Sequence, residues 1–170
     1  VIKDKAEAIH LYKMAIDKGN ANAMYGFALM LKKGDGVPKD KTEAARLFKM
    51  AIEKGNAYAM NGYANMLYEG DGVPKDKPEA ARLYKMAIDK GNVSAMNNYA
   101  NMLCEGDGVK MDKTEAARLY KMAIYKGNTD AMCGYANMLY KGDGVIMDRN
   151  EAVRLYMLAI KKGNNYVVIW

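Results

Sequence analysis

The segment Gly34-Asp35-Gly36-Val37-Pro38-Lys39-Asp40-Lys41-Thr42-Glu43-Ala44-Ala45-Arg46-Leu47 decides the fold because it recurs along the chain. Closely similar segments occupy residues 70–83, 106–119 and 142–155. A Lys-Gly pair keeps the same 36-residue step, with its glycine at Gly19, Gly55, Gly91, Gly127 and Gly163. A repeat of this length that contains two helical patterns predicts a solenoid of stacked helix hairpins.

Each repeat predicts two helices that are separated by the Gly-Asp-Gly turn. In the first helix Ala23, Met24, Phe27, Ala28 and Leu31 fall on one side at about 100° per residue, which indicates an amphipathic helix with a closely packed core face. First helices are expected at about 21–33, 57–69, 93–105 and 129–141, and second helices at about 41–54, 77–90, 113–126 and 149–162, with residues 4–18 as an additional second helix.

The ends of the second helices carry recognisable signals. Asp40 followed by Glu43 predicts a capping box, in which the aspartate accepts from the N3 amide and the glutamate reaches back to the N-cap amide. Gly55 after Lys54 predicts a helix end, because glycine adopts the left-handed conformation at low cost. The glycines of the Gly-Asp-Gly turn are expected to allow a tight chain reversal in the same way.

These signals predict that residues 1–170 form a single repeat array. The final residues, Tyr166-Val167-Val168-Ile169-Trp170, are apolar and depart from the repeat. They are either the start of a further module or a tail through which the protein self-associates. The expected modules are a half module at 1–19, full modules at 20–55, 56–91, 92–127 and 128–163, and a partial module or tail at 164–170.

The spaced residues Ala23, Phe27-Ala28, Leu31, Gly34-Asp35-Gly36-Val37, Asp40, Glu43-Ala44, Phe48, Ala51 and Gly55 resemble the Sel1-like repeat, a relative of the tetratricopeptide repeat. The chain departs from that pattern at Tyr63-Ala64, Tyr99-Ala100 and Tyr135-Ala136, where the family usually has Leu-Gly. The resemblance implies an all-α, right-handed superhelix of antiparallel helix hairpins with a concave groove. It also implies an adaptor or scaffold role.

Composition excludes several classes of protein. A hydrophobic share of 51% with 27% charged residues is typical of a folded soluble protein, and no apolar run reaches the roughly 20 residues of a membrane span. The net charge of +6 comes from lysines and arginines that alternate with acids, so a nucleic-acid partner is not expected. The residues near the N-terminus are charged, so no secretory signal is recognised there, although the chain begins inside a module. A cytoplasmic location is expected.

The most informative surface is the side of the first helix opposite its core. We call it the first-helix face; it comprises positions 22, 25, 26, 29, 32 and 33 and their equivalents. Tetratricopeptide-like layouts place this face on the concave side. The candidate peptide-binding residues are Tyr25, Leu29, Tyr58, Asn61, Asn65, Tyr68, Asn97, Asn98, Asn101, Asn137 and Tyr140.

Asparagines at one register of that face suggest a binding role. Asn65, Asn101 and Asn137 form a ladder, although asparagine is unfavourable inside a helix. Carboxamides can pair with the main chain of an extended peptide, and neighbouring tyrosines can supply contact area. The alternative is that duplication copied a harmless asparagine into each module.

Catalytic, metal and cofactor sites are not expected. His10 lies at a solvent-side position without an ordered acid or nucleophile partner. The Gly-Asp-Gly turns lack the lysine spacing of a P-loop and the oxygen ligands of an EF-hand. Cys104 and Cys133 are expected to be free thiols, because their positions on neighbouring helices put them beyond disulfide reach.

The sequence therefore predicts a non-enzymatic scaffold or adaptor that binds an extended peptide or partner segment. One alternative is a structural spacer within a longer array. The other is an enzyme: some cysteine-rich relatives bind or hydrolyse β-lactams, but those carry a regular cysteine pair in each module, which this chain lacks.

Overall fold

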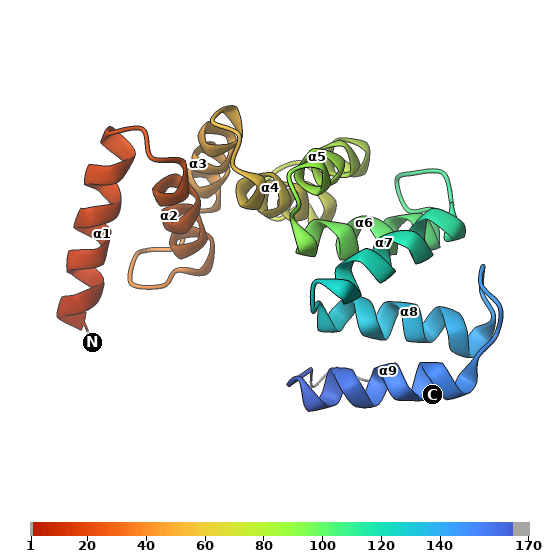
Figure 1. Cartoon of the computed structure of the whole chain (residues 1–170). Helices are drawn as coiled ribbons and strands as arrows, with labels where there is room; N and C mark the ends of the chain where they lie inside the picture. The colour runs from red at the N-terminus through yellow and green to blue at the C-terminus, as the bar shows by residue number, and fades with distance from the viewer. Residues whose placement is uncertain (1, 165–170) are drawn as a thin grey trace. The chain divides into compact units, whose positions relative to one another are not determined.

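The computed structural model describes residues 2–164, and side chains from Lys5 onward. All of the regular secondary structure in that part of the chain is α-helical, and consecutive helices form hairpins (Figure 1). The expected all-α fold of helix-hairpin repeats is confirmed. The helices are α1 (Ile2–Asp17), α2 (Ala21–Lys33), α3 (Lys41–Glu53), α4 (Ala57–Glu69), α5 (Lys77–Asp89), α6 (Val93–Glu105), α7 (Lys113–Tyr125), α8 (Thr129–Lys141) and α9 (Arg149–Lys161).

The chain divides into two compact units. Unit 1, Val1–Gly91, contains α1 to α5, and unit 2, Asn92–Trp170, contains α6 to α9. Within them the hairpins are α2–α3, α4–α5, α6–α7 and α8–α9, each packed along its length. The residues proposed as a tail, 166–170, lie outside the described part of the chain.

Each first helix begins and ends through the same local chemistry. The Asn56 side chain accepts a hydrogen bond from the amide of Ala59 at 2.8 Å, which satisfies one of the unpaired donors at the helix start. At the other end Gly70 has φ of 74° and Gly72 has φ of 78°. These left-handed conformations, which favour glycine, reverse the chain after α4.

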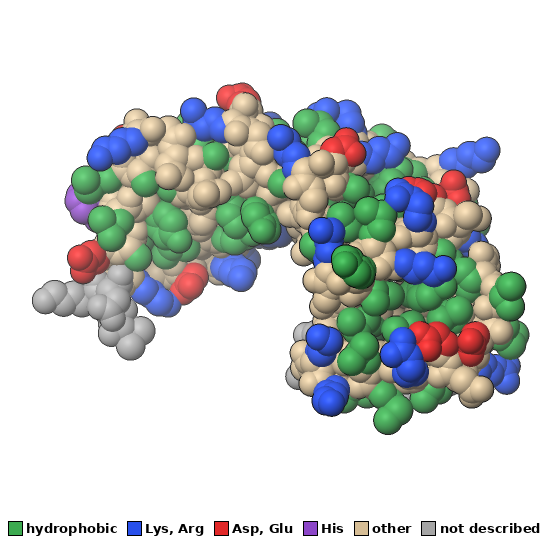
Figure 2. All heavy atoms as spheres, in the orientation of Figure 1, with side chains coloured by type: hydrophobic (Ala, Val, Ile, Leu, Met, Phe, Trp, Pro, Cys, Tyr) green, Lys and Arg blue, Asp and Glu red, His purple; other side chains and the backbone are tan. Residues whose placement is uncertain are grey.

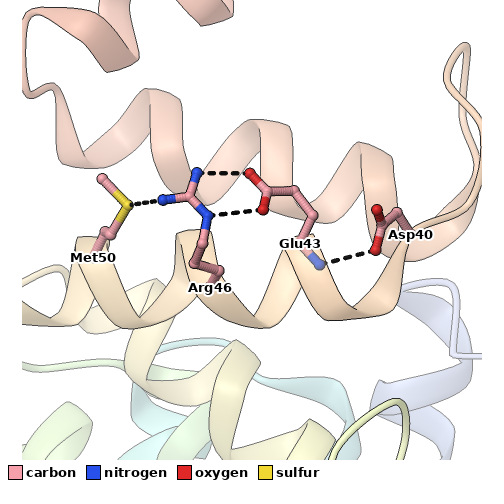
Figure 3. Close-up of polar contacts among 4 residues, drawn as sticks. All are labelled: Asp40, Glu43, Arg46 and Met50. Carbon is pink, nitrogen blue, oxygen red and sulfur yellow. Dashed lines mark hydrogen bonds and ion pairs between the residues drawn. The ribbon is translucent and has the colours of Figure 1, made fainter.

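Of the two hydrogen bonds that the predicted capping box requires, the second helix α3 forms one (Figure 3). Asp40 accepts from the Glu43 amide at 2.9 Å, as predicted, but the Glu43 carboxylate does not return to the Asp40 amide. That amide donates instead to the Leu31 carbonyl at 3.0 Å, so the carboxylate is released to pair with Arg46 through two bonds of 2.7 Å. Arg46 also contacts the sulfur of Met50 at 2.9 Å.

Small and large apolar side chains alternate in the core. Ala44 and Ala51 are fully buried, so that neighbouring helices approach closely around Phe48. Leu47 is only 1% exposed and also belongs to the core. In unit 2 the equivalent cluster consists of Met132, Ala136, Leu139, Ala152, Leu155, Tyr156 and Ala159. Burying each large side chain contributes about 1.5–3 kcal/mol.

Candidate functional site

The structure places the eleven predicted residues on first helices in both units. Tyr58, Asn101 and Asn137 are exposed, whereas Asn97 is only 7% exposed and offers little surface to a ligand. The remaining predicted residues are half-buried: Tyr25, Leu29, Asn61, Asn65, Tyr68, Asn98 and Tyr140.

The asparagine ladder has a structural partner that the sequence reasoning missed. A tyrosine of the second helix donates its hydroxyl to the asparagine oxygen of the same hairpin, 19 residues earlier. The bond from Tyr84 to Asn65 is 2.6 Å long. The other two pairs are Tyr120 with Asn101 and Tyr156 with Asn137.

The first full module supports this assignment by lacking both partners. It has Leu29 where the others have asparagine, and Phe48 where the others have tyrosine. A buried tyrosine hydroxyl needs an acceptor, and a phenylalanine does not. The linked change from Asn/Tyr to Leu/Phe was visible in the sequence, and it explains why asparagine is kept inside these helices.

The pairing changes what the amides offer to a ligand. Because each carboxamide oxygen accepts a tyrosine hydroxyl, the amide is held in one orientation with its N–H groups as the remaining donors. Asn101 and Asn137 are exposed. These two positions of unit 2 therefore offer both amide N–H groups to hydrogen-bond acceptors such as peptide carbonyls.

A glycine on the first-helix face makes room for the aromatic ring of the preceding second helix. A Cβ added to Gly134 would come within 2.6 Å of the Tyr120 ring. In unit 1 a Cβ at Gly62 would lie 3.1 Å from the Phe48 ring. The second-helix ring thus packs beneath the next first helix, and in unit 2 this packing fixes the frame that holds Asn101.

The aromatic residues of the first-helix face in unit 1 also contact one another. The rings of Tyr25 and Tyr58 lie 5.7 Å apart between centroids, and Tyr25 is 6.1 Å from the Phe48 ring. Burial, with a smaller contribution from Tyr58, raises the pKa of Tyr25. Tyr58 remains 62% exposed, so this cluster presents aromatic surface to solvent.

Two further tyrosines are engaged with cations of the following second helix. The Lys77 ammonium lies 5.2 Å from the centre of the Tyr68 ring, and the Arg149 guanidinium lies 5.2 Å from that of Tyr140. Such contacts stabilise a hairpin by about 0.5–1 kcal/mol at exposed sites. Tyr68 and Tyr140 therefore have a role in the fold apart from any ligand.

A pocket of about 200 Å³ opens between α6 and α8 in unit 2. The predicted residues Asn101 and Asn137 both contribute to it, and Cys104 lies beside them. Burial raises the pKa of Cys104, whose thiol contacts the sulfur of Met138 at 3.7 Å. The full lining is Asn101, Cys104, Glu105, Tyr120, Gly134, Asn137, Met138, Lys141 and Asp143.

A larger hollow of about 510 Å³ lies among α7, α8 and α9. Ile124, Leu139 and Leu155 form its apolar part, and Lys121 and Glu151 stand among its polar walls. On the face shown in Figure 2, lysines and arginines are dispersed among acids and hydrophobic side chains rather than gathered into one basic field.

The described residues contain no group of three or more His, Cys, Asp or Glu side chains that could hold a metal ion. His10 is exposed, and Cys104 and Cys133 are free, half-buried thiols. No helix in the described part of the chain is both long enough and apolar enough to cross a bilayer.

Comparison with protein families gives a match along nearly the whole chain. The family model of the Sel1 repeat matches residues 1–20, 21–56, 57–92, 93–128 and 129–164. Comparison with curated proteins gives no match.

Solved structures are similar over most of the chain. A Sel1 repeat protein from Oxalobacter formigenes is 31% identical with a TM-score of 0.87, covering 95% of this chain and 66% of that one. A protective antigen of uropathogenic Escherichia coli strains, which displays an SLR fold, is also 31% identical, with a TM-score of 0.80 over 90% of this chain and 33% of that one. The chain thus spans only part of both proteins.

A third structure, the Pseudomonas aeruginosa immunity protein Pa5087, is 19% identical with a TM-score of 0.66. The match covers 92% of this chain and 58% of the immunity protein. At this identity the likeness shows the shared fold alone.

Proposed function

The chain belongs to the Sel1 repeat family, and from that premise we propose that it is a non-enzymatic scaffold that binds an extended segment of a partner protein along its first-helix face. Sel1 repeat proteins are generally protein–protein interaction scaffolds. The finer proposal concerns which surface is used and by which chemistry.

The observation that carries the proposal is the pair of exposed, oriented amides in unit 2. Asn101 and Asn137 lie at the same register of successive first helices and line one pocket. Each has its oxygen engaged by a buried tyrosine, and its amide N–H groups can donate to an acceptor on a ligand. An extended peptide carries such acceptors along its main chain whatever its sequence.

The frame supports binding because it is organised before the ligand arrives. Tyr120 is 3% exposed and Tyr156 is 4% exposed, and both rings are packed within the helix core. Holding the amides through these rings reduces the entropy that is lost when a ligand binds. In unit 1 the exposed ring of Tyr58 would add amphipathic contact area.

The test removes the amides without leaving unpaired groups in the core. The first module shows that a Leu/Phe pair is compatible with the fold, so the variant is Asn101→Leu, Tyr120→Phe, Asn137→Leu, Tyr156→Phe. Peptides are selected on the wild-type chain from a phage-displayed library of short random sequences, and their affinities for both chains are measured by titration calorimetry. Two lost hydrogen bonds predict a weakening of about tenfold or more.

Glu115→Gln is the control, because its partner Arg118 lies on the exposed side of α7. The peptides should bind this control with wild-type affinity. If the quadruple variant also binds them with wild-type affinity, the amides have only a structural role. A library that yields no binding peptides would favour a structural spacer, and β-lactam hydrolysis by the purified chain would favour the enzyme alternative.

A further inference from the structure

We propose that unit 2 selects the order of charges in the bound segment, with a basic side chain of the segment facing Glu105 at the end of α6 and an acidic side chain facing Lys141 at the end of α8. This inference rests on the proposed peptide-binding function. It goes further in naming the chemistry of two side chains in a segment whose main chain pairs with the amides of Asn101 and Asn137.

The pocket between α6 and α8 holds charges of both signs beside its two exposed amides. Its charged side chains are Glu105, Lys141 and Asp143. The charge of Asp143 is already compensated, because Lys113 forms an ion pair with it. Glu105 and Lys141 are both exposed, and neither forms an ion pair with another residue in the part of the chain that the structure describes. A ligand at the pocket therefore meets one uncompensated anion and one uncompensated cation.

Glu105 stands apart from the other acidic residues of unit 2. Each of the others, within the described residues, has an interaction partner inside the fold: a helix-cap amide, a basic side chain or a carboxamide. They are Asp107, Asp112, Glu115, Asp130, Asp143, Asp148 and Glu151. Glu105 is thus the acid whose counter-ion the fold of unit 2 does not supply.

The place of Glu105 in its helix is also unfavourable without a cation. It is the last residue of α6, and the last turn of that helix contains no basic residue. The carbonyl end of a helix carries partial negative charge, which disfavours an acid and favours a base. Lys141, the last residue of α8, has the favoured sign. A basic side chain of a ligand would provide Glu105 with the compensation that its own helix lacks.

The charge of Glu105 is felt inside the pocket. Burial raises the pKa of the Cys104 thiol most, and the negative charge of Glu105 is among the contributions that raise it further. Cys104 and Glu105 both line the pocket. The acid therefore acts on the space where the ligand is proposed to lie, rather than only on bulk solvent.

The geometry sets the spacing of the two ligand charges. Glu105 follows Asn101 by four residues, and Lys141 follows Asn137 by four, so each charge lies one helical turn beyond its amide on the same side. The two helices contact each other, and packed helices lie about 8–10 Å apart. An extended chain covers that distance in two or three residues, at about 3.3 Å each. The basic and acidic side chains should therefore be two or three residues apart.

The experiment uses the whole chain and synthetic peptides as the probe. Each peptide is a library-selected binder in which pairs of positions two or three residues apart carry Lys and Glu, in both orders. The two isomers have the same composition and net charge. One pair of positions should show about a fivefold or greater difference in affinity between the orders, since an exposed ion pair alone changes affinity by about two- to fivefold. At about 1 M salt, where the screening length is about 3 Å, the difference should largely disappear.

The decisive variant exchanges the charges of the protein. Glu105→Lys with Lys141→Glu keeps the net charge, and both new residues already occur at this register, as Lys33 and Glu69. This variant should prefer the opposite isomer. The matched control exchanges Glu115 and Arg118 on the exposed side of α7 and should keep the wild-type preference.

A stability measurement separates this role from a structural one. Glu105→Lys alone should weaken binding of the preferred isomer by about two- to fivefold. Its unfolding free energy in urea should equal or exceed that of the wild type, because a cation replaces an anion at the end of α6. A loss of both stability and affinity would assign Glu105 to the fold and overturn the inference.

Failure of this inference can be told from failure of the scaffold proposal. If both isomers bind equally, or if the exchanged variant keeps the wild-type preference, the charge assignment is wrong even when the quadruple Leu/Phe variant still loses binding. If the Leu/Phe variant binds the peptides normally, the proposed first-helix face itself is wrong and the charge assignment falls with it.

Discussion

At the scale of single residues, the Tyr–Asn hydrogen bond shows how one contact serves the fold and prepares a surface. Tyr120 is almost fully buried, and its hydroxyl must find an acceptor. Asn101 supplies that acceptor from an exposed position, so its orientation is fixed from inside the core. Phe48 with Leu29 is the apolar solution to the same packing problem.

This pairing predicts strong non-additivity between the two positions. Asn101→Leu alone removes the oxygen acceptor of the Tyr120 hydroxyl, leaves it only the weaker Cys104 sulfur, and should cost about 1–3 kcal/mol of unfolding free energy. Adding Tyr120→Phe removes the unsatisfied group, and the double variant should recover most of the loss. Urea denaturation of the wild type, both single variants and the double variant gives the coupling energy. Additive losses would show that the hydrogen bond does not explain the asparagine.

At the scale of the helix, the second helices repeat one exposed Glu–Arg ion pair. A glutamate in the first turn pairs with an arginine three residues later, as Glu43 does with Arg46. The hydrogen bond from the arginine lowers the pKa of each glutamate; burial opposes it, and the arginine's charge adds a smaller lowering. The same pair recurs as Glu79 with Arg82, Glu115 with Arg118 and Glu151 with Arg154.

These pairs predict a loss of stability in acid. A carboxyl group whose pKa is lower in the folded state stabilises the fold above its unfolded pKa, near 4.3, and this contribution disappears as pH falls through the folded pKa. The glutamates are about one-third exposed, so each pair contributes only about 0.3–0.5 kcal/mol. The triple variant Glu43→Gln, Glu79→Gln, Glu115→Gln should therefore be about 1 kcal/mol less stable than wild type near pH 7, and nearly equal to it near pH 3.

The measurement is urea unfolding across that pH range, with Glu53→Gln as the control because position 56, three residues on, is Asn56 rather than an arginine. The control should lose little stability at neutral pH. A constant difference between the triple variant and wild type at every pH would rule out the ion pairs as its cause.

Helices could be predicted almost residue by residue, because each is bounded by its own capping chemistry. The expected ranges of the first helices agree with α2, α4, α6 and α8, and the second helices end one residue earlier than expected. Contacts between distant side chains could not be read from spacing alone. The hydrogen bond from Tyr84 to Asn65 joins two helices across 19 residues, and the pocket beside Cys104 is lined by residues of α6, α7 and α8.

At the scale of the whole chain, most packing is between neighbours in sequence. Within each unit, every helix packs mainly on the helices next to it in sequence, and repeats of this kind have stabilities that approximate a sum of local terms. The chain divides into two compact units, each with its own buried leucines, alanines and aromatic rings. Such an array is expected to open locally before it unfolds completely.

Local opening predicts a localised response to damage in the core. Leu155 is 3% exposed in unit 2, and Leu155→Ala should cost about 2–5 kcal/mol there. In native-state hydrogen exchange, protection should fall most in α8 and α9, while α2, α3 and α4 keep wild-type rates, because the lost contacts belong to one end of a chain of nearest-neighbour interfaces. The matched variant Leu47→Ala, at a residue 1% exposed in unit 1, should give the reverse pattern. If either substitution lowered protection equally in every helix, the array would unfold as one cooperative body, and the pocket between α6 and α8 could not be perturbed independently of unit 1.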